Sequence, residues 1–383
     1  MDNFHFYRAH PLLAETRFTK SFLNSFDVQV FGGSTNTAYN NCGRKVPLFG
    51  RIGCEDFKEF PVNFSFDREK FKKDFCSGRF NIVETQLQAF INLDCGFFAH
   101  FHLPIRRFKL KHVFPLDKRN PLLTDKLNAN MRLLEQELNK HHLSTCNFKK
   151  TGVGDFTALI GWTGTTYDTA VLDYLDLTLQ TGILFPTSKK QDLSHIFDIP
   201  FGYNGHYANT LIVDGATGFC DWLTFGAHVE ALFFWDTNQK ARLNSRNLNL
   251  LDYPCTGFIR LDKACARVKE GNIWSASAYI KADHCISGFS LTLGYSHDHQ
   301  NAGGIFPLGK HTEIATITHK QDPLLSGWDM NIFHFILEYD CADEELLSAP
   351  RFGLAYNHII SGKNIFRNST LGGFLGINCV WDF

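Results

Sequence analysis

The sequence predicts an all-β fold: an antiparallel up-and-down transmembrane β-barrel of about twelve strands (12–14), with one helix in a long loop. Three observations support this prediction. Apolar residues recur at every second position in a dozen segments, which is the period of a strand with one apolar face. No apolar run approaches the ~20 residues of a membrane-spanning helix. Long connections alternate with short ones along the chain.

Composition narrows the classes of function. A chain of 383 residues could form two soluble domains or one large barrel. The net charge of -1 gives no support for nucleic-acid binding or for a polybasic membrane-surface protein. The 38 phenylalanines suit pleated surfaces and membrane–water interfaces, where aromatic side chains concentrate. The 11 cysteines are odd in number, so at least one thiol has no partner within the chain.

The C-terminal stretch, Thr370 to Phe383 (TLGGFLGINCVWDF), shows the alternation most clearly. Counted back from the last residue, every second position forms the apolar set Phe383, Trp381, Cys379, Ile377, Leu375, Gly373 and Leu371. The interleaved positions are smaller and more polar. A period of two places the first set on one face of a strand and the second set on the other.

Eleven further segments alternate in the same way and complete a set of twelve predicted strands. They are 17–31, 80–93, 97–113, 154–163, 172–185, 206–214, 221–234, 274–282, 286–296, 328–339 and 352–360. One helix is predicted, from Leu122 to Leu143, with Thr124 as its N-cap and an otherwise charged surface. It is too polar for lipid, so we expect it to decorate a long loop over 114–153.

The connections sort by length. With Phe383 at one end of the barrel, the connections on that side are short: 94–96, 164–171, 215–220, 283–285 and 340–351. Those on the other side are mostly long: 32–79, 114–153, 186–205, 235–273, 297–327 and 361–369. Long loops at one end and short turns at the other are typical of transmembrane barrels, whereas a soluble sandwich has no reason to sort its loops.

Alternation also predicts what lines the interior. An open sheet edge has no partner in a bilayer, so the sheet must close and its polar face must surround a lumen. The predicted lumen-lining residues are Glu84, Gln86, Gln88, His100, His102, Asp176, Gln180, His228, Glu230, Lys281, His334, Glu338, Asn357 and Asn378. Twelve strands enclose more space than side chains fill in an eight-stranded barrel. We therefore expect a segment to narrow the lumen, and Gly32 to Gly50, rich in turn-forming residues, is the candidate plug.

The sequence predicts neither a catalytic site nor a metal site. His100 and His102 have the spacing of a metal pair, but no third ligand is identifiable, so no metal or other cofactor is predicted. The chain contains no GxSxG or HExxH motif, so no catalytic residue is predicted either. An interface girdle is favoured over a soluble core for the aromatic residues near strand ends: Trp162, Phe185, Trp222, Trp328 and Trp381.

The stretch that ends on Phe383 resembles the C-terminal signal of bacterial outer-membrane β-barrels, which include porins and transporters. In that family the last strand is read by the assembly machinery and then pairs with the first strand. The resemblance implies an outer-membrane location, lipid and the barrel-assembly machinery as partners, and an assembly signal made of Leu375, Ile377, Trp381 and Phe383. The segments GDFTALIGW and LQTGILFPTSKK also resemble hairpins of transporters related to the long-chain fatty-acid channels.

Three classes of function remain open. The first is a channel or transporter for passive passage of small solutes, including partly hydrophobic ones, with lumen charges of both signs and hence little ion selectivity. The alternative is a non-conducting surface anchor or adhesin that binds through its long loops, especially 114–153 and 235–273. The third is a barrel enzyme, which the absence of catalytic motifs disfavours. Discrete conductance steps across a planar bilayer separate the first class from the second.

Overall fold

A computed structural model of the chain describes twelve stretches of the sequence. They are residues 23–48, 77–112, 136, 139–144, 147–167, 172–219, 222–243, 262–286, 288–309, 317–318, 325–341 and 349–380. Of the predicted helix 122–143, the described residues Gln136, Asn139 and Lys140 are helical and the greater part lies outside the described residues. No helix among the described stretches is long and apolar enough to cross a membrane.

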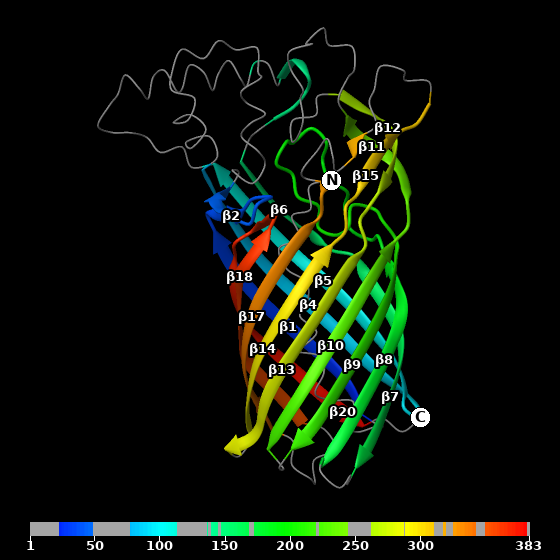
Figure 1. Cartoon of the computed structure of the whole chain (residues 1–383), viewed down its shortest axis with the longest axis vertical. Helices are drawn as coiled ribbons and strands as arrows, with labels where there is room; N and C mark the ends of the chain where they lie inside the picture. The colour runs from blue at the N-terminus through cyan, green and yellow to red at the C-terminus, as the bar shows by residue number, and fades with distance from the viewer. Residues whose placement is uncertain are drawn as a thin grey trace, which may run out of the picture.

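The described strands form a closed antiparallel barrel, which confirms the predicted fold class (Figure 1). Two consecutive strands, β6 (Phe148–Val153) and β7 (Phe156–Tyr167), pair with successive parts of the same neighbour, β5 (Phe97–His112). They therefore share one position in the wall, which has twelve strand positions in all. The other wall strands are β1 (Leu23–Thr35), β4 (Gly78–Asp94), β8 (Tyr174–Phe185), β9 (Ala208–Phe219), β10 (Leu223–Phe234), β13 (Ile273–Ile286), β14 (Phe289–Gln300), β17 (Trp328–Asp340), β18 (Ala349–Lys363) and β20 (Ser369–Val380).

The last strand closes the barrel against the first. β20 pairs with β1 from Leu23 opposite Val380 to Gly33 opposite Thr370, and β1 pairs on its other side with β4. The aliphatic side chains predicted to face outward do so, since Leu371, Leu375 and Ile377 are 62%, 53% and 45% exposed. Every backbone donor and acceptor of the closing strand therefore has a neighbouring strand, as hydrocarbon requires.

The strand ends are arranged as the length pattern predicts: ends that few residues separate along the chain lie at one end of the barrel, and ends that many residues separate lie at the other (Figure 1). The turn between β4 and β5 has only two residues, Cys95 and Gly96, and both adopt positive φ, as a two-residue hairpin turn requires. Strands reach further than predicted: β14 runs to Gln300, and β6 occupies the end of the predicted loop 114–153. Below, the two ends are called the short-turn end and the long-loop end.

The predicted plug segment 32–50 belongs in part to the barrel wall and in part to a small separate sheet. Gly32 to Thr35 continue β1 in the wall, so that boundary of the segment is wrong. The next described residues form β2 (Thr37–Tyr39) and β3 (Lys45–Pro47), which pair with β19 (Ile365–Phe366) as a small sheet at the long-loop end. A second sheet there contains β11 (Thr237–Leu243), β12 (Asp262–Lys269), β15 (Gly304–Pro307) and β16 (Ile317–Thr318).

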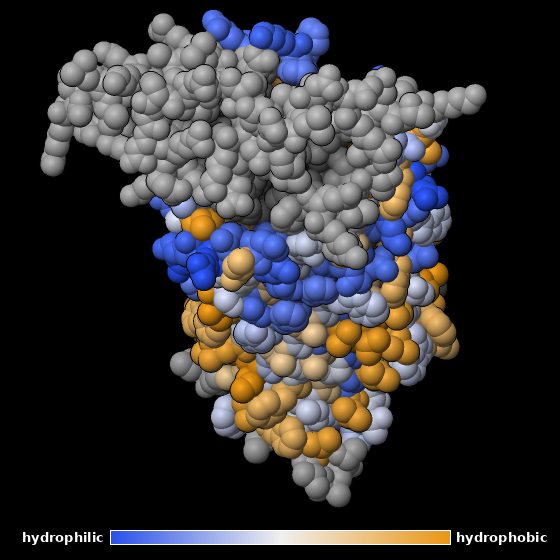
Figure 2. All heavy atoms as spheres, turned by 45° about the horizontal axis from the view of Figure 1, so that its top comes forward, coloured by the Kyte–Doolittle hydropathy of each residue, from blue (hydrophilic) through white to orange (hydrophobic). Residues whose placement is uncertain are grey.

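The outer surface of the wall carries an apolar band (Figure 2). It is bordered at the long-loop end of β7 to β10 by a chain of ring contacts of 5.7–6.3 Å through Phe101, Phe156, Phe185, Tyr207 and Trp235. At the short-turn end, Phe289, Tyr339 and Phe352 contact one another across β14, β17 and β18. Aromatic belts that flank an apolar band mark the two interfaces of a membrane.

One residue of the predicted girdle points the other way. Trp162, Phe185 and Trp222 are exposed on the outside as predicted, but Trp328 is 1% exposed and packs inside the barrel. The prediction for Trp328 was wrong because this residue begins β17 in the inward phase, together with Met330 and Ile332. Trp381 lies outside the described residues.

Candidate functional site in the barrel lumen

The predicted polar faces turn into the lumen. Ten of the predicted lining residues are buried there: Glu84, Gln86, Gln88, His100, Gln180, His228, Lys281, His334, Glu338 and Asn357. His102, Asp176 and Glu230 are half-buried and line the same cavity as His100. Asn378 belongs to β20, where it pairs with Ser25 and Ala349, and its side chain lies outside what the structure describes.

The lumen has two unlike walls. Along β14, β17, β18, β20 and β1, polar side chains contact one another. His334 links Ser296, through Nε2 at 3.0 Å, to Asn357, through Nδ1 at 2.6 Å. Asn357 in turn donates to Thr370 Oγ1 at 3.3 Å. This set crosses four adjacent strands, and we call this side of the lumen the paired wall.

The strongest element of the paired wall is a buried arginine. Arg351 is 1% exposed, and its guanidinium contacts Asp27 at 2.5 Å and Glu338 at 3.3 Å. Asp27 also accepts a hydrogen bond from Ser25 Oγ at 2.9 Å. The guanidinium lies 5.5 Å from the ring centre of Phe374. Because Asp27 is on β1 and Arg351 on β18, these contacts reach across the closing strand β20 and hold the barrel shut.

The opposite side of the lumen, β4 to β10, encloses a cavity of about 140 Å³ and is called the cavity wall below. Its central feature is a polar chain across four strands. His100 Nδ1 contacts Gln180 Oε1 at 3.1 Å, Gln180 Nε2 donates to Asp214 Oδ2 at 3.4 Å, and Asp214 Oδ1 contacts His228 Nδ1. The His100 ring also stacks on Phe90, with 3.9 Å between centroids.

The atoms that face the cavity without a hydrogen-bond partner are mostly acceptors. They include Gln88 Oε1, Asp176 Oδ1 and His100 Nε2. When His100 donates through Nδ1 to Gln180, its Nε2 in the neutral ring carries a lone pair. Burying such acceptors without donors costs free energy, so the cavity is suited to water or to a solute rich in N–H and O–H groups.

Charge in the cavity is mainly negative. Its lining carries the carboxylates of Asp155, Asp176, Asp214 and Glu230. The one Lys or Arg among the lining residues, Arg106, is bound to Glu84 by an ion pair of 2.9 Å. Two further buried cations lie outside this cavity. Lys281 contacts Asp283, and Arg351 contacts the acids of the paired wall. Sequence analysis expected lumen charges of both signs and hence little ion selectivity, whereas in this cavity four carboxylates stand against one arginine.

Residues 186–207, between β8 and β9, fold inward over the cavity, and we call them the cap. Phe201 of the cap stacks on Phe108 of β5 at 5.2 Å, and Arg106 Nη1 donates to its carbonyl oxygen. Asp155 accepts hydrogen bonds from the backbone N–H groups of Ser188 and Tyr203, at 3.0 and 2.5 Å. Gly202 lies so close to Asp155 that a Cβ there would meet the carboxylate at 2.1 Å.

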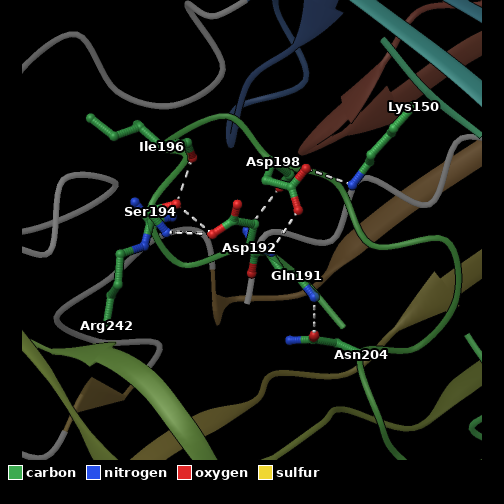
Figure 3. A network of polar contacts seen from close by, with 8 residues as sticks. All are labelled: Lys150, Gln191, Asp192, Ser194, Ile196, Asp198, Asn204 and Arg242. Atoms are coloured by element: carbon green, nitrogen blue, oxygen red, sulfur yellow. Dashed lines mark hydrogen bonds and ion pairs between the residues drawn. The ribbon is translucent and has the colours of Figure 1, made fainter. Parts of the chain in front are cut away.

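A polar network holds the cap together (Figure 3). Asp198 accepts from Lys150 Nζ of β6 at 2.5 Å and from the backbone N–H of Asp192 at 2.7 Å. The carboxylate of Asp192 accepts from the Oγ and the backbone N–H of Ser194. These bonds, the Oγ bond foremost, hold the pKa of Asp192 below its ordinary value. The cap is thus fastened to the wall at β5, β6 and β7.

An apolar cluster fills the lumen at the long-loop end. It contains Tyr39, Leu184, Ala208, Leu232, Ile273, Trp328, Met330, Ile332, Ile359 and Ile365, with Tyr203 and Phe234 packed against it. Tyr39 of the predicted plug segment donates from its hydroxyl to the Ile360 carbonyl at 2.8 Å. The cavity therefore lies beneath a layer built from the cap, from β2 and from the upper parts of the wall strands.

Sequence analysis missed the cap and most of its anchors. Gly202 and Tyr203 lie in a segment without periodicity, whereas Asp155 and Arg106 were assigned only to strands. The segment FDIPFGYNG, between two predicted strands, combines aromatic residues with turn-formers, and that composition is a usable signal for a folded-in loop. The described residues contain no group of three or more His, Cys, Asp or Glu side chains arranged to hold a metal.

Comparisons with known proteins support the fold. No family model matches the chain, and no curated protein matches it by sequence. An outer membrane channel from Pseudomonas putida F1 is similar in structure, with 12% identity, a TM-score of 0.52, and coverage of 94% of this chain and 95% of that one. The translocator domain of autotransporter NalP from Neisseria meningitidis matches at 7% identity and a TM-score of 0.37, over 95% and 90% of the two chains. At 12% identity the likeness to the Pseudomonas putida channel concerns the fold alone, and together with the closed strand pairing and the apolar exterior it gives the conclusion that the chain has the fold of an outer-membrane β-barrel.

Proposed function

We propose that the protein is a passive outer-membrane channel for small solutes that carry hydrogen-bond donors and positive charge, such as protonated amines. The observation that carries this proposal is the cavity wall, where four carboxylates and a set of unpartnered acceptors face a space of about 140 Å³. A solute with N–H donors pairs with these groups, whereas an anion meets four carboxylates and a single cation, Arg106, that is already paired with Glu84.

The shape of the lumen supports a narrow and selective pathway. The cavity follows the wall from Arg106 and Gly202, beneath the cap, down to Asp176 and Ala216 near the short-turn end. The apolar side chains Leu159, Ile212 and Leu232 alternate with the polar groups on its surface, so an alkyl chain can accompany the charged end of a solute. Passage at the long-loop end requires displacement of the cap, because Tyr203 lines the cavity and packs against the apolar cluster.

Single-channel recording in planar bilayers tests the proposal. The purified protein should give discrete steps, and a KCl gradient should reveal preference for K⁺ over Cl⁻. Asp176→Asn with Asp214→Asn removes two cavity charges and should lower the cation-to-anion permeability ratio several-fold. A small diamine such as putrescine should block the wild-type current more strongly than the current of the double variant.

Asp236→Asn with Asp329→Asn is the matched control. It removes two charges as well, but from an exposed position before β11 and a site on the outer face of β17. Its selectivity should equal that of the wild type. Absence of conductance steps from correctly folded protein would refute the channel, and equal loss of selectivity in both double variants would refute the role of the cavity.

A second candidate is a surface-binding barrel, which the sheet of β11, β12, β15 and β16 favours. This sheet lies at the long-loop end and has its own buried cluster, which includes Leu243, Val268, Ile305 and Leu325 (Figure 1). A folded platform of this kind can present a surface to a partner. Intact cells that display the protein would then bind a macromolecule, and replacement of 237–269 by a short linker, which removes β11 and β12 but keeps the wall strands β10 and β13, would be expected to abolish that binding.

We also propose that the C-terminal strand is the site at which the barrel-assembly machinery recognises the chain. Support comes from its place as the closing strand and from the outward-facing Leu375 and Ile377. Deletion of Phe383 should lower the fraction of heat-modifiable barrel in membranes. Refolding of the same variant in detergent, where no machinery is present, should be unchanged.

A further inference from the structure

A cluster of outward-facing cations occupies three adjacent strands above the apolar band. Along β5, the outward positions pass from Leu103 and Ile105 to Arg107, Lys109 and Lys111. Strand alternation spaces these side chains about 7 Å apart on one face. On the neighbouring strands, Arg79 of β4 lies opposite Lys111, and Lys149 of β6 lies opposite Lys109. We call Arg79, Arg107, Lys109, Lys111 and Lys149 the cationic patch.

The patch faces away from the lumen. Residues of β4 at the same phase are Val83 and Leu87, both exposed on the lipid-facing side. The inward positions between the patch residues are taken by Phe108 and Leu110, which are buried. The cations therefore continue the outer face of the wall beyond its apolar part, toward the long-loop end.

The pairings within the patch are unfavourable without a counter-charge. Two cations directly opposite each other on adjacent strands repel, and this arrangement occurs twice, at Arg79–Lys111 and Lys109–Lys149. Among the described residues, no carboxylate forms an ion pair with a residue of the patch, and Arg79 Nε donates to the neutral Ser34 Oγ at 2.9 Å. An anion from outside the chain would remove this repulsion.

On the other side of the barrel, the outward polar side chains near the long-loop end have hydrogen-bond partners on neighbouring strands. On β14, β17 and β18, the outward polar groups contact one another: His297 Nδ1 and Tyr295 Oη both lie 2.8 Å from Asn331 Oδ1, and His299 contacts Asp329. Asn331 Nδ2 donates to Ser361 at 2.8 Å. The cluster of cations without a counter-charge is thus a feature of β4 to β6, and the outward residues of β14, β17 and β18 near the same end do not share it.

We propose that the cationic patch binds phosphate groups of an anionic lipid in the outer leaflet, with the acyl chains against the apolar face of β4 and β5. The apolar-to-cationic sequence along each strand matches the order of acyl chain and headgroup in such a lipid. Arg107 and its neighbours supply a fixed array of N–H donors at the spacing of adjacent outward positions, so a lipid with two phosphates can engage the array at two points.

Lipid binding by the full chain in detergent micelles tests this proposal. Diphosphorylated lipid A is the probe, and native mass spectrometry counts the bound lipid. Arg107→Gln, Lys109→Gln and Lys111→Gln are combined in one variant. A cation near an anionic lipid surface contributes about a five-fold effect on affinity, so the triple variant should bind roughly 100-fold more weakly.

Controls separate the patch from general charge and from free phosphate. Lys189→Gln, Lys190→Gln and Lys240→Gln remove three exposed cations from the cap and β11, and this variant should bind lipid A like the wild type. Heat-modifiable mobility confirms that both variants are folded barrels. Dephosphorylated lipid A should bind weakly, and millimolar inorganic phosphate should not displace the lipid.

Three outcomes would overturn the proposal. Equal lipid binding by the patch variant and the wild type would remove the patch as the site. Equal binding of the phosphorylated and dephosphorylated lipids would remove the phosphate. Displacement of lipid A by inorganic phosphate would identify free phosphate, and not the lipid, as the occupant.

Discussion

The two walls of the lumen use the same kinds of residue for different purposes. On the paired wall, Arg351, Asp27 and Glu338 contact one another, and His334 joins two neighbours. On the cavity wall, His100 uses one ring nitrogen on Gln180 and presents the other, without a partner, to the cavity. Both walls are polar, but on the second the unpartnered acceptors line a cavity, whereas the unpartnered atoms of the first, such as Gln29 Oε1 and Arg351 Nε, do not line it.

The difference indicates which polar residues stabilise the barrel and which are available to bind water or a solute in the lumen. A buried polar group that is fully paired rigidifies its surroundings, whereas an unpaired one costs free energy and persists where a ligand or water compensates. The paired wall lies next to the junction of β20 with β1, the last pairing needed for closure. The cavity wall lies opposite, beneath the cap.

The largest expected effect is from Arg351→Met on the paired wall. Removal of the guanidinium leaves Asp27 and Glu338 buried without their common partner, so we expect a loss of about 3–5 kcal/mol in the free energy of unfolding. Urea titration in detergent micelles, followed by heat-modifiable gel mobility, measures it. Asp27→Asn added to Arg351→Met should recover part of the loss, and a cost below about 1 kcal/mol for the single variant would show that this ion pair does not hold the closing strands.

The contrast between the walls marks the limit of prediction from sequence. Alternation alone placed Glu84, His100 and His334 in the lumen, because a period of two fixes the face of each residue. It could not tell that both ring nitrogens of His334 have partners and only one of His100 does, since those partners come from other strands. The prediction for Trp328 was wrong for a related reason. Its position near a strand end suggested an interface residue, but the alternation of β17 places its side chain on the inward face. The cap has no periodicity and escaped notice.

Asp155→Ala should loosen the cap while leaving the paired wall intact. The variant deprives the backbone N–H groups of Ser188 and Tyr203 of a charged acceptor, and hydrogen bonds to charged groups contribute about 1.5–3 kcal/mol each. Limited proteolysis should cut residues 186–207 at least ten-fold faster, and single-channel steps should be larger or longer. Asp173→Ala, at an exposed aspartate near the short-turn end, is the control. Unchanged cleavage would mean that the cap is held mainly by Phe201 and Lys150.

Matched histidine variants compare the walls directly. His334→Ala leaves Ser296 and Asn357 with unmet hydrogen bonds in a closed interior, so we expect a cost of about 2 kcal/mol. His100→Ala opens onto the cavity, where water can replace the ring, so the cost should be about 1 kcal/mol or less. Both are measured by urea titration of the folded barrel. Equal costs would contradict the division into a paired wall and a cavity wall.

The smallest effect concerns the outer part of the cap and depends on pH. Because the pKa of Asp192 in the folded protein is below its ordinary value of 3.8, its ionised form adds stability above that value, and this contribution is lost as pH falls through the lowered pKa. Pepsin cleavage within 186–207 should therefore accelerate as pH falls below about 4. Ser194→Ala removes the Oγ bond that does most to lower the pKa, so its cleavage rate should depend less on pH. The same pH dependence in both proteins would mean that Asp192 does not govern the acid sensitivity of the cap.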